Sequence, residues 1–398
     1  MADHIPFVNG KSDCDRLRQY YSDSLMLRVS LDSISTIWTS LPKKMSLWID
    51  PAIDGYHNLL IGQRIHRLAR DWRECINQFD ENEILFNSRF LNPPDSEKVR
   101  TFVTSAMGKC LKYKPEWITV PQLPMVNDSS RNKINRALAK ATCEWRSKSQ
   151  FKGKLILPLI FTHQNQLRLK VQWKAKLKLA KACYDNAEAD GIWVVDSDLY
   201  DQKGSGTFGR RFSQLIEFHK NLKETFPKNT TRIAGPYWGM NLVLWARELC
   251  DRPAISLGTA YRYYISGSFI RPGKLRVAIS PLRRWAVADY QLREWLETAL
   301  KQFSSSDPAS RELSYLVDRY DILTSQSDAA RDQVARFYKE WFDKIEASPP
   351  AGRALALYQD LSSAYVIGKQ RQLPELPKSE APGRAPERVA QQFMLNCL

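Results

Sequence analysis

The sequence has no paired cysteines and few histidines. Its seven cysteines stand singly, with no C-x-x-C pair, and it contains five histidines. Single, scattered cysteines are typical of proteins in a reducing compartment, where cysteine serves as a small core residue. This pattern argues against a disulfide framework or a zinc cage. We therefore expect a cytoplasmic protein without a metal site, and we assign it no cofactor.

Long apolar runs are also missing. The longest, such as Leu155–Phe161, have the length of a strand and fall short of the roughly 18–20 residues that a membrane span needs. The first residues, MADHIPFVNGKSD, lack a basic stretch followed by an apolar one, so we expect neither export nor membrane insertion. Apolar residues nevertheless make up 43% of the 398 residues, which is enough for a sizeable core.

Acidic residues are scarce in one stretch of the chain, where much of the positive charge lies. The formal net charge is +16, and the stretch from Arg131 to Asp185 has 14 Lys or Arg residues against two acids. Such a field attracts polyanions, although two long solvated helices could also carry these lysines. We expect nucleic acid, DNA or RNA, or another phosphate-bearing partner. The residues predicted to contact it are Lys170, Lys174, Lys176, Lys178, Lys181, Arg210 and Arg211.

Between Met45 and Phe303, short apolar runs alternate with amphipathic stretches. The runs are continuously apolar, as strands covered on both faces are, and their spacing of about 35–40 residues predicts parallel strands with right-handed crossovers. Seven candidate strands can be counted, and an eighth is expected near Asn82–Phe90. This number favours an α/β fold of the closed (β/α)8 TIM-like barrel type over an open doubly wound sheet. The seven runs are MSLWID, EWITVPQ, KLILPLIF, GIWVVDSDL, TRIAGPYWG, AISLGTAYRYY and LRVAISPL.

Four segments are expected along the chain. Residues 1–44 form an N-terminal helical cap, and residues 45–303 form the barrel. Residues 304–369 form two or three helices after the turn-rich SSSDPAS, and residues 370–398 form a proline-rich linker that ends in a short helix. We expect the C-terminal extension to offer a surface for partner subunits.

Polar residues end the candidate strands, and in a barrel such positions carry function. Carboxylates, amides and aromatic rings on one rim could stack a planar heterocycle and hydrogen-bond its edges. The predicted catalytic residues are Asp50, Asp54, Asp196 and Asp198. The predicted substrate-binding residues are Tyr56, His163, Gln164, Gly235, Tyr237, Tyr261 and Arg262.

Simpler interpretations exist for parts of this rim. Asp50 or Asp54 could cap the helix that follows. The acids of DSDLYD, from Asp196 to Asp201, are a weak signal for a divalent cation. QKGSGTFGRR lacks the G-x-x-x-x-G-K-[ST] register of a P-loop, so we interpret it as a rim loop that ends in two arginines.

The order of these strand ends resembles the tRNA-guanine transglycosylases and their DNA-modifying relatives. LWIDPAIDGYH is similar to the family's first strand motif, an aspartate followed by small residues, glycine and an aromatic residue. PLIFTHQNQ, ADGIWVV and TRIAGPYWGMNLVLWARELCDRPAISLG follow the rhythm of later family strands, so the resemblance covers roughly residues 45–265. It implies a (β/α)8 barrel that exchanges a guanine for a 7-deazaguanine base in nucleic acid, with Asp50 or Asp54 near the base.

Two family features are missing from the sequence. Where the family has its nucleophilic aspartate, the chain reads ISLGTAYR, which has no acid. The family's zinc site needs C-x-C-x-x-C and a later histidine, whereas only Cys397 follows Cys250 and no histidine follows His219. A glycosyl–carboxylate intermediate needs a carboxylate near the anomeric carbon, so Asp196 or Asp198 would have to supply it.

Two hypotheses remain open from the sequence. In the first, the chain is a transglycosylase-like enzyme that acts on a base in DNA or RNA, with Asp50 or Asp54 as acid, base or recognition group. In the second, it is an inactive nucleic-acid-binding or scaffold subunit of a DNA-modification or defence complex. The missing nucleophile favours the second hypothesis, and the acid-rich rim favours the first.

Overall fold

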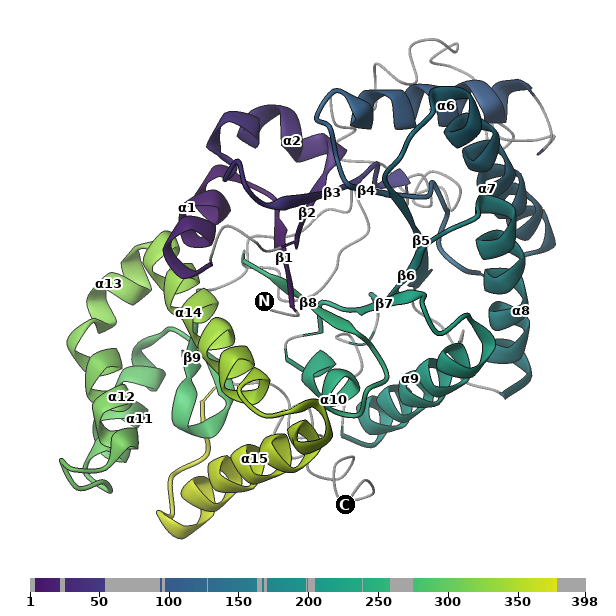
Figure 1. The fold of residues 1–398 in the computed structure, drawn as a ribbon. Helices are drawn as coiled ribbons and strands as arrows, with labels where there is room; N and C mark the ends of the chain where they lie inside the picture. The colour runs from purple at the N-terminus through teal and green to yellow at the C-terminus, as the bar shows by residue number, and fades with distance from the viewer. Residues whose placement is uncertain are drawn as a thin grey trace.

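The fold is seen in a computed structural model of the chain, which describes residues 4–21, 26–53, 94, 97–126, 128–162, 167, 170–197, 199, 205–237, 239–257 and 275–377. Eight parallel strands form a closed barrel in the order of the chain, and Figure 1 looks down this ring of strands. The predicted (β/α)8 barrel is therefore confirmed. The strands are β1 (Ile5–Val8), β2 (Met26–Ser30), β3 (Ser46–Asp50), β4 (Trp117–Thr119), β5 (Lys154–Phe161), β6 (Gly191–Asp196), β7 (Thr231–Ala234) and β8 (Arg252–Ser256).

Helices surround the barrel and cover the outer faces of its strands (Figure 1). Strand side chains alternate between this outer layer and the barrel interior. In β6, for example, Ile192 and Val194 join the outer core, whereas Trp193 and Val195 lie in the barrel interior. The helices up to β8 are α1 (Lys11–Tyr20), α2 (Leu31–Ile37) with the 3-10 turn η1 (Trp38–Ser40), α6 (Glu97–Leu111), α7 (Ser129–Ser149), α8 (Lys170–Ala187), α9 (Ser205–Thr225) and α10 (Asn241–Ala246).

The barrel begins earlier in the chain than the sequence predicted. Residues 1–44 were expected to form a helical cap, but IPFV and MLRVS are β1 and β2. Both runs are only four or five residues long and lie beside helix-forming segments. Over the roughly 11 or more residues needed to recognise a periodic pattern, the helical pattern of the neighbours therefore dominates. LRVAIS, in contrast, lies outside the barrel and forms β9 (Arg276–Ile279), which pairs antiparallel with β10 (Arg284–Val287). The strand expected near 82–90 falls outside the described residues.

A long helix from the segment after β8 packs against the helices that surround the barrel. Helix α14 (Ser327–Glu346) packs against α1, and its Phe342 ring stacks on Trp245 of α10 with centroids 6.2 Å apart. Tyr20 of α1 donates a hydrogen bond to Asp332 of α14 over 2.7 Å. Gly239 permits this packing, because its φ is +83° and a Cβ there would lie 2.7 Å from the Trp341 ring. Hence α14 belongs to the barrel, not to a separate extension from residue 304.

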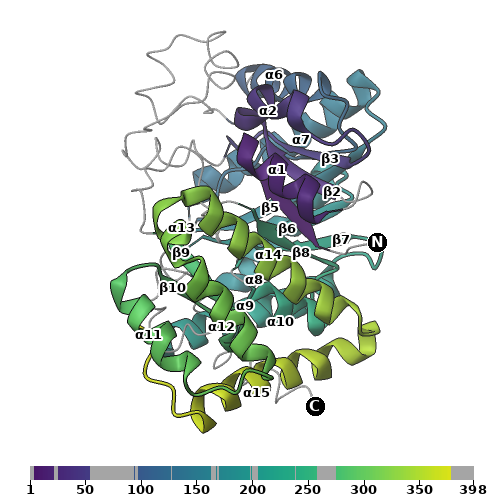
Figure 2. The same ribbon diagram turned by 90° about the vertical axis from the view of Figure 1, so that its left-hand side faces the viewer.

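The remaining C-terminal elements build a smaller unit beside the barrel, which Figure 2 shows from the side. Its own core joins the β9–β10 hairpin to the helices that follow, through residues such as Leu296 and Leu313. Besides the hairpin, the elements of this unit are η4 (Ser280–Leu282), α11 (Tyr290–Leu300), α12 (Pro308–Asp318), α13 (Tyr320–Ser325), η5 (Pro350–Gly352) and α15 (Arg353–Gln370).

Among the described residues, no helix is long and apolar enough to cross a membrane.

Candidate functional site

Aromatic rings fill the barrel interior. Phe7 of β1, Trp48 of β3 and Trp193 of β6 contact one another edge to face, with centroids 5.3–5.6 Å apart. The guanidinium of Arg28, on β2, lies 4.9 Å from the Phe7 centroid and 5.6 Å from the Trp193 centroid. A cation over aromatic faces is stabilised by the ring quadrupoles, and this interaction is stronger in a dry interior than at an exposed site.

Arg28 forms an ion pair with Asp50, the last residue of β3. Both side chains are 4% exposed. Asp50 lies on the same face of β3 as Trp48, so its carboxylate points into the barrel near the carboxyl ends of the strands. The second carboxylate oxygen accepts the Ala52 N–H over 2.9 Å and fixes a turn in which Ala52 has φ +54°. Asp50 therefore combines a turn-stabilising role with a place in the barrel interior.

Asp196 does not face Asp50 across the barrel mouth. It shares the outer face of β6 with Ile192 and Val194, because strand side chains alternate. There Arg211 of α9 binds both of its carboxylate oxygens, each over 2.7 Å, and the Asp196 side chain has no exposed surface. The sequence placed Asp196 with Asp50 on one rim, but Asp196 points out of the barrel, and Arg211 holds this carboxylate in place of the predicted phosphate.

The side chain of Tyr237 is also buried. Its hydroxyl donates to the Val194 carbonyl over 3.0 Å and accepts the Asp196 N–H over 3.1 Å. Complete burial raises the pKa of Tyr237 well above its usual value, so the phenol stays neutral. Gly235, with φ +91°, and the cis bond to Pro236 set the turn that brings the ring inward. Tyr237 thus supports the end of β6, contrary to its predicted role in substrate binding.

Seven predicted site residues lie outside the described residues, so their part in the site stays a prediction. They are Asp54, Tyr56, His163, Gln164, Asp198, Tyr261 and Arg262.

The predicted basic flank forms the outer face of α7 and α8, which pack side by side (Figure 1). Six of its cations are exposed, and across the described part of the chain none of the six forms an ion pair. They recur at intervals of three, four, seven or eight residues, so each helix presents them on one side. These six residues, called the basic face below, are Lys133, Arg136, Lys140, Lys148, Lys174 and Lys178.

Other predicted phosphate contacts have different surroundings. Lys181 pairs with Asp185 one turn along α8, and Lys176 is buried at 3% exposure. Arg210 is exposed on α9, whereas the neighbouring Arg211 is buried against Asp196. Lys170 begins α8, and its side chain is outside the described structure. Lys176 and Arg211 are therefore corrections to the predicted surface set, because helix periodicity turns both inward.

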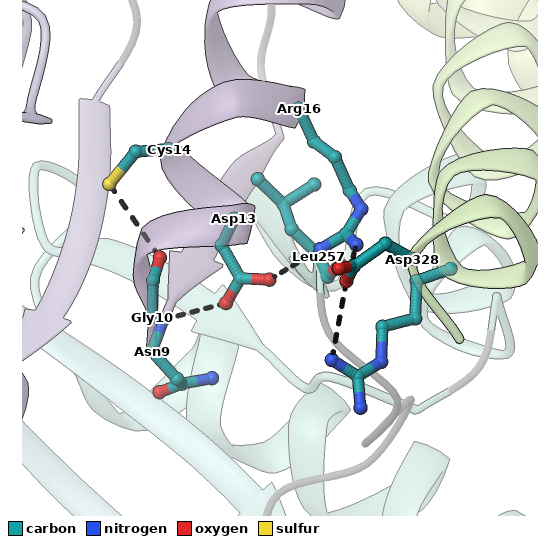
Figure 3. A network of polar contacts seen from close by, with 8 residues as sticks. Asn9, Gly10, Asp13, Cys14, Arg16, Leu257 and Asp328 are labelled. Carbon is teal, nitrogen blue, oxygen red and sulfur yellow. Dashed lines mark hydrogen bonds and ion pairs between the residues drawn. The ribbon is translucent and has the colours of Figure 1, made fainter. Parts of the chain in front are cut away.

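A buried polar network closes the barrel where β1 meets β8, and Figure 3 shows its residues. Arg16 of α1 donates to Asp13 over 2.9 Å, to the Leu257 carbonyl over 3.3 Å and to Asp328 of α14 over 3.1 Å. Asp13 also accepts the Asn9 N–H over 2.9 Å. Burial raises the pKa of Asp13, and the Asn9 hydrogen bond and the Arg16 charge oppose that shift. We call this network the β1–β8 seam.

No protein-family model matches the chain, and no curated protein matches it. Within the residues that the structure describes, no cluster of His, Cys, Asp and Glu could hold a metal ion.

Sequence reasoning missed the partner of Asp50. Arg28 lies in MLRVS, and a lone arginine within an apolar strand was the available signal, since a buried charge requires a partner. The segment was interpreted as helical, so this arginine was not placed in the barrel. The exposed arginine and lysines of α7 were counted in the charge excess but were not singled out.

Proposed function

We propose that this chain is a nucleic-acid-binding barrel that engages the phosphate backbone through the basic face. The carrying observation is the set of six exposed cations on two adjacent helices, none paired with an acid in the described structure. The one acid within this side of α7, Glu144, is held by Arg100 over 3.2 Å. An unneutralised field of this kind favours a polyanion, because each phosphate contact releases condensed counterions.

Charge reversal tests the proposal. Lys133, Arg136, Lys174 and Lys178 are replaced together by Glu, and binding to labelled single- and double-stranded DNA and RNA is measured by fluorescence anisotropy between 50 and 200 mM salt, a range set by the usual counterion response. We expect wild-type affinity for duplex DNA to fall with a log–log slope of about −4.5 to −5.5, since some five or six phosphates would be neutralised. The variant should bind at least tenfold more weakly, with a flatter slope.

The matched control reverses four exposed lysines elsewhere, Lys11, Lys43, Lys228 and Lys301, which gives the same change in net charge. This control should retain most of the affinity, because a localised interface depends on where the charge lies. Equal losses in both variants would mean that net charge alone attracts the polymer. No binding by the wild type at low salt would refute nucleic-acid binding.

A second candidate function is recognition or exchange of a base in the barrel, as the resemblance to the transglycosylases implies. The observation that favours it is the Arg28–Asp50 pair, a carboxylate and a guanidinium among aromatic rings at the carboxyl ends of the strands. A planar heterocycle could stack there and hydrogen-bond to Asp50. Asp196 is not part of this candidate, because its side chain lies on the outer face of β6, where Arg211 holds it.

Incorporation of radiolabelled guanine into DNA and tRNA tests this chemistry. If the wild type incorporates label, Asp50→Asn, assayed under conditions where the variant is folded, should abolish incorporation, since the amide keeps the shape and removes the charge. Asp185→Asn, on the exposed face of α8, is the control and should leave incorporation unchanged. Label incorporated equally by wild type and Asp50→Asn would remove Asp50 from the reaction. Wild-type binding without incorporation would favour the scaffold hypothesis.

A further inference from the structure

A pair of exposed lysines precedes or begins each of three neighbouring strands at the amino end of the barrel. The strands are β3, β4 and β5, which are hydrogen-bonded side by side. Their pairing holds the approaching segments together, because the Glu116 N–H donates to the Leu47 carbonyl over 3.0 Å and the Lys154 N–H donates to the Glu116 carbonyl over 2.8 Å. These six residues, called the lysine rim below, are Lys43, Lys44, Lys112, Lys114, Lys152 and Lys154.

The lysine rim keeps most of its positive charge. None of the six ammonium groups forms an ion pair with a residue that the structure describes, and Lys154 lies 4.7 Å from the centroid of the Trp117 ring. Glu116 is the one acid in the segments that join η1, α6 and α7 to these strands, and its Oε2 accepts the Ser46 hydroxyl over 2.8 Å. Because strand pairing holds these like charges together, a polyanion at the rim would relieve their repulsion.

An exposed aromatic ring lies against the lysine rim. Trp38, in η1, is 44% exposed, whereas every other tryptophan that the structure describes is buried. Its ring contacts that of Tyr113, which lies between two lysines of the rim, with centroids 5.1 Å apart and an angle of 64° between the planes. This contact holds the indole at the rim with part of its surface open to solvent. Nucleic-acid bases stack on such rings whatever their sequence, while nearby cations bind the backbone.

A membrane surface fits the rim less well than nucleic acid does. Tryptophan and lysine also occur together at membrane interfaces, but binding there depends on the apolar area that inserts. The other large apolar side chains that are exposed in the described structure lie on α11, α13 and α15, away from the three strands of the rim. The rim instead continues the basic face, because Lys148, in the last turn of α7, precedes Lys152 by four residues. A strand on the basic face could therefore extend onto the rim.

We propose that the lysine rim binds a single-stranded segment of nucleic acid, with a base stacked on Trp38 and the phosphates beside the lysines. This inference rests on the proposed function and adds to it a surface that selects the single-stranded form. Bases within a duplex are stacked on one another, whereas an unpaired base can be splayed out onto an aromatic side chain. The basic face binds the backbone of either form, so the two surfaces differ in the strand that they prefer.

Anisotropy of labelled single strands of about 12 nucleotides, and of the matching duplex, tests the role of Trp38. Trp38→Ala should bind the single strand about 5- to 150-fold more weakly, the usual effect of losing one stacked base, and the duplex as tightly as the wild type does. Trp38→Phe keeps an aromatic ring and should retain most of the affinity. Tyr290→Ala removes another exposed aromatic side chain, on α11, and is the control that should behave as the wild type.

Salt dependence tests the lysines. Replacing Lys112 and Lys114 by Gln should flatten the log–log salt slope for single strands by about 1.4, since each lost phosphate contact removes about 0.7. The four-lysine control of the charge-reversal experiment includes Lys43, so it should lose some affinity for single strands and none for duplex.

The outcomes separate this inference from the proposed function. If the wild type binds duplex but Trp38→Ala binds single strands as tightly as the wild type, the inference is wrong and the proposed function stands. No binding of any nucleic acid by the wild type would refute both. If Trp38→Ala loses binding to vesicles that contain phosphatidylserine and keeps its affinity for single strands, the rim is a membrane-binding surface and the inference is overturned.

Discussion

The replacement Asp196→Asn tests whether the carboxylate of Asp196 has a structural or a catalytic role. Arg211 donates two hydrogen bonds of 2.7 Å to Asp196, whose side chain is fully buried, while that of Arg211 is 8% exposed. The amide can accept one of these bonds but turns an N–H group toward the other, and the buried arginine loses the negative charge of Asp196. Breaking a buried pair on one side costs about 3–5 kcal/mol.

Urea unfolding at pH 7 measures this loss. The midpoint should fall with an unchanged m-value, and Tm should drop by roughly 10 °C, since about 1 kcal/mol corresponds to a few degrees in a domain of this size. Asp185→Asn is the control, because the exposed Lys181–Asp185 pair on α8 contributes about 0.5 kcal/mol or less. The double replacement Asp196→Leu with Arg211→Met should recover most of the stability, as apolar substitutes for buried pairs often do.

Nucleic-acid binding by Asp196→Asn, measured where the variant is folded, should equal that of the wild type. A variant that keeps its stability within about 0.5 kcal/mol, the range of an ordinary surface substitution, and loses function would refute the structural role. The outward-facing carboxylate would then have to act in catalysis, as the sequence predicted.

Two other residues give predictions of stability. Burial, with a smaller contribution from the charge of Lys339, lowers the pKa of His4 to about 3. Below pH 6.5 the unfolded chain therefore binds a proton at His4, whereas the folded chain stays unprotonated there. The free energy of unfolding should fall by about 3 kcal/mol between pH 6.5 and 4 from this group. Urea midpoints across this range should fall less steeply in His4→Leu, and identical pH profiles would exclude His4 as a cause. Gly239→Ala should cost about 2–4 kcal/mol in urea unfolding, because it combines a φ of +83° with a contact of 2.7 Å to Trp341; a loss below about 0.5 kcal/mol would show that α14 shifts freely.

The barrel was predictable from the sequence because its long strands are continuously apolar and evenly spaced. Six of the seven candidate runs are barrel strands, and KLILPLIF is the clearest example. The first two strands were missed because runs of four and five residues carry too little pattern to outweigh neighbouring helical segments. LRVAIS was misplaced for the opposite reason, since apolar composition does not distinguish a barrel strand from a buried hairpin.

The site was less predictable, because the end of a strand shows how far along the barrel a side chain lies but not whether it points into the barrel or away from it. Asp50 and Asp196 both end strands, yet one shares a face with Trp48 and the other with Val194. A shift of one residue in the alternation reverses the side on which a carboxylate lies. Pairing added a second difficulty. The partners Arg28 and Arg211 are 22 and 15 residues away, and only the folded chain brings them to their acids.

The β1–β8 seam has a consequence for how the chain is made. The register that pairs Ile5 with Ala254 joins segments about 250 residues apart, so at about 5–20 residues per second the first strand leaves the ribosome roughly 12–50 s before its partner. Asp328, which Arg16 binds, follows later still. Throughout that interval the growing sheet has two open edges, which can pair with other nascent chains. We expect synthesis of this protein to depend on chaperones that shield Ile5–Val8 until the last strand arrives.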